Sequence, residues 1–97
     1  MNAVLNIYAD CASEKPTKSY VCRRLLLGVS KKVQALSENM DGKSAEEQER
    51  ITVDILKTIF PNFETADFEF VDPLEYAAFV AAIAAETNEI IENAVKK

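Results

Sequence analysis

Residues 72–96 read DPLEYAAFVAAIAAETNEIIENAVK, and this stretch decides the fold of the chain. It opens with a capping aspartate, Asp72, followed by proline at the first helical position and a carboxylate, Glu75, at the third. The large apolar side chains that follow recur with the 3.6-residue period of one helix face. The stretch therefore predicts one long helix over residues 72–96.

The opposite face of this predicted helix carries only small apolar side chains. They lie at i, i+3, i+4 and i+7 and are Ala78, Ala81, Ala82 and Ala85. An all-round apolar helix favours burial on every side, and a domain of 97 residues has little material to cover both faces. Two interpretations stay open. Alanine is a strong helix former that tolerates water, or the stripe is a contact face for another helix, in a partner or in a second copy.

A first helix is predicted over residues 23–40, because apolar side chains recur at helical spacing from Leu25 to Met40. Gly42 then lies where a left-handed helix cap is wanted. Gly28 interrupts the pattern and costs about 1 kcal/mol relative to alanine. It either permits close approach by another segment or is incidental, and we favour close approach.

A second helix is predicted over residues 44–60. Ser44 and Glu47 have the spacing of a capping box, and Pro61 ends the helix. Its apolar residues spread over an arc of roughly 200° at 100° per residue, which predicts a central and largely buried helix.

The N-terminal residues 4–22 predict a β-hairpin. Apolar and polar residues alternate from Leu5 to Cys11, and a polar turn surrounds Pro16. A turn at that proline places Cys11 opposite Cys22. A disulfide is one interpretation of this pairing. We favour two reduced cysteines that act as small apolar residues, as in other intracellular proteins.

Residues 61–71 mix three phenylalanines with three acidic residues. Thr65 is a candidate cap for a short helical turn. We interpret the phenylalanines as core residues that pack beneath a connecting segment. The alternative is an acidic, aromatic motif that binds a partner.

Composition completes the fold prediction. Leu, Ile, Val and Phe make up 27 of the 97 residues, which is enough for a folded chain, and glycine and proline together number only five. We expect a single domain over residues 1–97 of the mainly α (α+β) class. Its expected layout is an N-terminal β-hairpin followed by three principal helices, the last one long.

Charge is unevenly distributed along the chain. The formal net charge of −5 divides into +3 over residues 1–43 and −8 over residues 44–97, and no basic residue lies between Thr58 and Val95. One interpretation is a solubilising surface, and the other is a bipolar molecule that meets partners electrostatically. Nucleic acid is a poor candidate partner, because the basic half is weakly charged and the whole chain repels phosphate.

Several kinds of chemistry are excluded. Without histidine there is no Ser-His or Cys-His nucleophile, and two cysteines cannot form a four-ligand zinc site. There is no glycine-rich phosphate loop and no secretory signal, and the longest uncharged apolar run, 76–85, is about half a membrane span. We therefore expect a soluble, cytoplasmic, non-enzymatic protein without catalytic residues, cofactor or metal, which does not bind a membrane.

The order of these elements resembles a known family. The segments RRLLLGV (23–29) and ILKTIFPNFETADFEF (55–70), followed by the helix from Asp72, resemble the tail assembly chaperones of long-tailed phages and prophages, especially those of Gram-positive hosts. The resemblance covers roughly residues 17–95. It implies a protein that binds the tape measure protein, keeps its hydrophobic helices soluble and recruits the major tail protein.

For the contact surface, the stripe and the charge distribution suggest four alanines combined with basic residues of the first helix. The predicted partner-binding residues are Arg24, Lys31, Lys32, Ala78, Ala81, Ala82 and Ala85. A homo-oligomer through the last helix is a further possibility. The alternative function is a small acidic regulator, antitoxin-like or anti-repressor-like, that occupies a basic partner protein.

Overall fold

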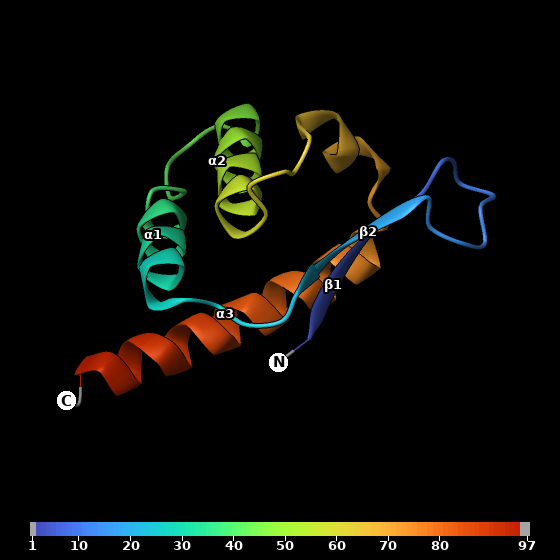
Figure 1. Cartoon of the computed structure of the whole chain (residues 1–97). Coiled ribbons are helices and arrows are strands. Elements are labelled where there is room, and N and C mark those ends of the chain that lie inside the picture. Colours follow the sequence, from blue (N-terminus) through green and yellow to red (C-terminus); the bar gives the residue numbers. More distant parts are fainter. Residues whose placement is uncertain (1, 96–97) are drawn as a thin grey trace.

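The computed structural model describes residues 2–95, which form a two-stranded hairpin followed by helices (Figure 1). This arrangement confirms the predicted α+β layout with a long last helix. The elements are β1 (Ala3–Ile7), β2 (Lys18–Cys22), α1 (Leu27–Glu38), α2 (Ala45–Ile59), the 3-10 helix η1 (Thr65–Phe70) and α3 (Pro73–Val95).

Helix α3 is the base on which the other elements rest. Its 23 residues extend over about 35 Å at 1.5 Å per residue. The hairpin and α1 both pack on it, and α2 and η1 lie above them (Figure 1). The core forms where these elements meet, around the fully buried Leu5 and Leu56. At its centre the rings of Phe60 and Phe79 stack with their centroids 5.8 Å apart.

The predicted N-caps of the second and last helices are confirmed, whereas Gly42 lies beyond the end of α1, which is capped by Asn39. The backbone N–H of Glu47 donates a 3.2 Å hydrogen bond to the hydroxyl of Ser44, which caps α2. The N–H groups of Leu74 and Glu75 donate to Oδ1 of Asp72, at 2.8 and 3.4 Å, and this carboxylate caps α3. These caps bond the first free N–H groups of each helix, and so local sequence fixes where α2 and α3 begin.

The predicted register of the hairpin is wrong. The strands pair from Ala3 opposite Cys22 to Ile7 opposite Lys18, and so Cys11 does not face Cys22. Both cysteines are free; Cys11 is exposed, whereas Cys22 is buried against the core.

The strand ends early because the next residue has another partner. The N–H of Tyr8 donates a 2.9 Å hydrogen bond to the carbonyl of Phe70 in η1. The N–H of Thr17 donates to the carbonyl of Ile7 at 2.7 Å and closes the loop formed by residues 8–17. The alternation that suggested a longer strand continues into this loop without forming a ladder.

Helix α1 is shorter than the predicted 23–40 helix. It begins at Leu27, and the preceding residue is extended, with φ −76° and ψ 151°. Residues 23–26 are used to cross from β2 to α1, and Leu25 is buried within that connection. The interpretation of Gly28 is also wrong, because a Cβ atom at this position would meet nothing within 4 Å.

Helix α2 is not the central helix that its apolar arc predicted. Within α2 only Val53 and Leu56 are buried, while Ile51, Ile55 and Ile59 are partly exposed. The wide arc is explained by two neighbouring surfaces. One packs on α1, and the other borders the groove described below.

The segment after α2 forms the predicted short helical turn as η1, although Thr65 does not cap it. Phe63 is buried and packs against the ring of Tyr20. Phe68 is half-buried and meets the ring of Tyr76 edge to face, with centroids 5.5 Å apart. Phe70 is exposed. Two of the three phenylalanines therefore pack as predicted, and the third lies at the surface.

Candidate functional site

An apolar groove of about 280 Å³ lies between α1, α2 and α3. Each helix contributes one wall. Representative lining residues are Val33 and Ser37 of α1, Ile55 and Ile59 of α2, and Val80 and Thr87 of α3. None of the lining residues is charged, in a chain of which 28% is charged. The groove therefore suits an apolar occupant that leaves water when it binds.

The groove is long enough for a helix. Its α3 wall runs from Tyr76 to Asn88, which corresponds to about 18 Å at 1.5 Å per residue. An amphipathic helix anchors itself through side chains at i, i+3 or i+4, and i+7, which span about 10 Å along its axis. The α3 wall is therefore longer than the span of these anchoring side chains.

Thr87 lines this groove, and its hydroxyl is buried and unpaired. The residue is 5% exposed, and its Oγ1 has no hydrogen-bond partner. Elsewhere in the chain, Thr52 and Thr58 donate to the carbonyl four residues earlier, at 2.8 Å in each case. A buried hydroxyl without a partner costs about 1–3 kcal/mol. Thr87 therefore retains unused hydrogen-bonding capacity beside the groove.

Ser30 provides an internal comparison for Thr87. Its side chain is fully buried and its Oγ is also unpaired, but the residue does not line the groove. The two hydroxyls therefore separate the effect of an unpaired polar group on stability from its effect on binding.

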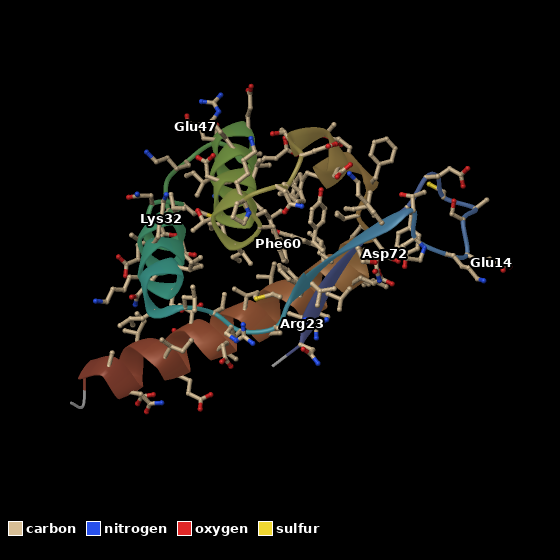
Figure 2. The ribbon with its side chains drawn as sticks, in the orientation of Figure 1. Glu14, Arg23, Lys32, Glu47, Phe60 and Asp72 are labelled. Carbon is tan, nitrogen blue, oxygen red and sulfur yellow. The ribbon has the colours of Figure 1, made fainter. Side chains whose placement is uncertain are left out.

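The predicted partner-binding residues belong to three different elements. The four alanines are exposed together on the flank of α3 that faces away from Phe79 and Ile83. Arg24 is exposed in the connection before α1. Lys31 and Lys32 lie on α1, where helical spacing places them opposite the buried Ser30 and Val33, and Figure 2 labels Lys32 on this helix. The alanines share one surface, while the basic residues lie on other elements.

A buried polar cluster was not predicted. Asp67 of η1 accepts a 2.7 Å hydrogen bond from the hydroxyl of Tyr20. It also forms an ion pair with Lys18, whose Nζ lies 2.7 Å from the carboxylate. Burial alone would raise the pKa of Asp67, but the bonds from Lys18 and Tyr20 outweigh it and hold the pKa below its ordinary value. In the sequence Asp67 is one of several acids, and no local signal distinguishes it. The cluster fastens η1 to the hairpin.

The groove was also missed, because periodicity assigns its lining residues to the core. Apolar spacing is the same whether a face meets a neighbouring side chain or an open groove. One signal was present in the sequence. The arc of apolar residues in α2 is wider than one packing partner requires.

No family model, no curated protein and no solved structure matches this chain. Within residues 2–95, no helix is long and apolar enough to cross a membrane. The same residues contain no group of three or more cysteine or acidic side chains placed to hold a metal ion.

Proposed function

We propose that this chain is a non-enzymatic tail assembly chaperone of a phage or prophage, acting in the cytoplasm of the bacterial host. In this proposal the groove between α1, α2 and α3 binds an amphipathic helix of the tape measure protein, and the complex helps to recruit the major tail protein. The observation that carries the proposal is the uncharged groove, beside which the hydroxyl of Thr87 is buried and unpaired. The resemblance of residues 55–70 to the chaperone family supports the choice of partner.

The chemistry of this role is binding alone. Apolar side chains of the partner helix leave water in the groove, which contributes about 25 cal/mol per Å² of apolar surface buried. Binding the partner before it aggregates keeps it soluble by mass action. The chain's net charge of −5 then helps to keep the complex in solution.

The test is co-expression with the tape measure protein encoded by the neighbouring tail genes. Wild-type chain is expected to raise the soluble fraction of that protein and to co-purify with it. Val80, which lines the groove, is 43% exposed, so Val80→Glu places a charge there without disturbing the core. This variant is expected to abolish co-purification.

Ala85→Glu is the matched control, since it adds the same charge to the opposite flank of α3. It is expected to leave co-purification unchanged. If Ala85→Glu blocks binding and Val80→Glu does not, the contact is the alanine stripe and the groove is not the site. If the wild-type chain neither solubilises nor co-purifies the tape measure protein, the chaperone function is wrong. Capture of a small basic, nucleic-acid-binding protein instead would favour the acidic regulator.

A further inference from the structure

Two exposed apolar patches of opposite charge lie on the surface of this chain, apart from the groove. Each patch pairs two large apolar side chains with two charged residues. We define the basic patch as Arg24, Leu26, Leu27 and Lys31, and the acidic patch as Glu69, Phe70, Asp72 and Leu74. The four apolar side chains are all exposed: Leu26 63%, Leu27 43%, Phe70 46% and Leu74 83%.

The basic patch occupies the connection from β2 and the first turn of α1. Leu27 and Lys31 are four residues apart in α1, so they lie one above the other on the same side of the helix. The sequence has no acidic residue between Glu14 and Glu38. The charges that neighbour the two leucines along the chain are therefore all positive. The first turn of α1 also lies by the C-terminal half of α3, which carries Glu86, Glu89 and Glu92.

The acidic patch is held firmly in place. The carbonyl of Phe70 accepts the hydrogen bond from Tyr8, and the carboxylate of Asp72 caps α3. The hydroxyl of Tyr8 also donates to both oxygens of Glu75, at 3.0 and 2.8 Å. These bonds fix the short segment from η1 to α3, and so its exposed phenylalanine and leucine belong to an ordered surface.

We propose that copies of this chain associate head to tail, with the basic patch of one copy docked on the acidic patch of the next. Opposite charges around two small apolar centres make the patches complementary to each other. Docking of like patches would bring like charges together, which disfavours a symmetric dimer through either patch. The inference is independent of the groove and of the proposed chaperone function.

The positions of the patches allow one copy to bind two neighbours. The first turn of α1 lies by the C-terminal half of α3, whereas Leu74 lies in the first turn of α3 (Figure 1). Because neither patch covers the other, association continues from copy to copy unless the rotation between them closes a ring. Pairing α3 with α3 of a second copy is disfavoured, because its charged residues within the described range are acidic: Glu75, Glu86, Glu89 and Glu92.

The contact is small, so we expect association that is weak and sensitive to salt. A docking surface of a few side chains lies at the low end of specific interfaces. Exposed charges at such a contact are screened over about 10 Å at 0.1 M salt. The average mass in solution should therefore rise with protein concentration and fall when salt is added.

The experiment is sedimentation velocity on the full chain and on two variants, each with one patch disabled. The basic-patch variant carries Arg24→Glu and Leu26→Ser, and the acidic-patch variant carries Glu69→Lys and Leu74→Ser. All four side chains are exposed, so both variants should remain folded, which circular dichroism checks. Lys57→Glu, at an exposed position in the last turn of α2, is a charge-reversal control that should associate like the wild type.

Wild-type chain is expected to form species larger than dimers at low salt, while each variant alone stays monomeric. An equimolar mixture of the two variants should form dimers and nothing larger, because only one intact basic patch and one intact acidic patch remain to meet. A wild-type chain that stays monomeric at millimolar concentration in low salt would overturn the proposal. So would a mixture that remains monomeric, or a single variant that dimerises by itself.

Discussion

The hydroxyl of Tyr20 donates a 2.7 Å hydrogen bond to Asp67, which lies 47 residues further along the chain. The bond joins β2 to η1 beside the ring contacts that Tyr20 makes with Phe60 and Phe63. Lys18, on the same strand, contacts the same carboxylate oxygen at 2.7 Å. A single acidic side chain therefore fixes the segment that leads into α3.

Stability should depend on pH through Asp67. Its pKa is lowered in the folded chain, so its contribution is complete above the ordinary pKa of aspartate, about 3.9, and is lost as pH falls through the lower folded value. Asp67→Asn is expected to cost about 1 kcal/mol at pH 7, since Lys18 is partly exposed. Urea unfolding measures the free energy of unfolding of both proteins at each pH. The difference between Asp67→Asn and wild type should be smaller at pH 3 than at pH 7. An equal difference at both values would contradict the assignment.

Thr87→Val should affect stability and binding in opposite directions. Valine has the shape of threonine without the unpaired hydroxyl, so the free energy of unfolding should rise by about 1 kcal/mol. On the proposed function, less tape measure protein should be recovered in a pull-down with this variant, because the buried hydroxyl beside the groove is lost. Ser30→Ala removes the other unpaired hydroxyl and should leave binding unchanged. A less stable Thr87→Val protein would mean that the hydroxyl has a partner in the folded chain.

The two glycines should respond differently to alanine. Gly28 lies in α1, where a Cβ meets nothing within 4 Å, so Gly28→Ala should stabilise the chain by about 0.5–1 kcal/mol. Gly42 has a φ of +77°, so Gly42→Ala should destabilise it by about 1–2 kcal/mol. The denaturant midpoint of each variant gives its change in the free energy of unfolding, provided that the m value equals that of the wild type. Destabilisation by Gly28→Ala would restore the close approach that the sequence suggested.

The two cysteines should react with a thiol reagent at different rates. Cys11 is exposed in the hairpin loop, whereas burial raises the pKa of the Cys22 thiol. One equivalent of thiol is expected to react promptly with Ellman's reagent in the native state, and the second only as the protein unfolds. Cys11→Ser should remove the fast phase alone. A mass two units lower under non-reducing conditions would instead show a disulfide.

The starts of α2 and α3 were predictable from the sequence, because they are determined by residues close together in the chain. Ser44 and Asp72 cap helices through N–H groups two or three residues away, so a short stretch of sequence was sufficient. The register of the hairpin was not predictable in this way. It depends on the bond between Tyr8 and Phe70, and nothing near Tyr8 shows that this distant carbonyl is its partner.

The candidate site was predictable only in part. Helical spacing in α3 places Thr87 on the face that carries Phe79 and Ile83, and in the structure it is buried with them. Whether its hydroxyl has a partner depends on the side chains of other helices, which periodicity does not describe. The groove is likewise a space between three helices, and its existence depends on how closely α2 approaches α3.

The contact between Tyr20 and Asp67 also bears on how fast the chain folds. Helical domains usually fold quickly because their contacts are local in sequence. Here the hairpin packs on α3, and η1 on the hairpin, across large sequence separations. Closing these long loops costs entropy before the contacts compensate for it, so folding should be slower than in a simple helical bundle. Stopped-flow refolding should therefore resemble that of mixed α/β domains.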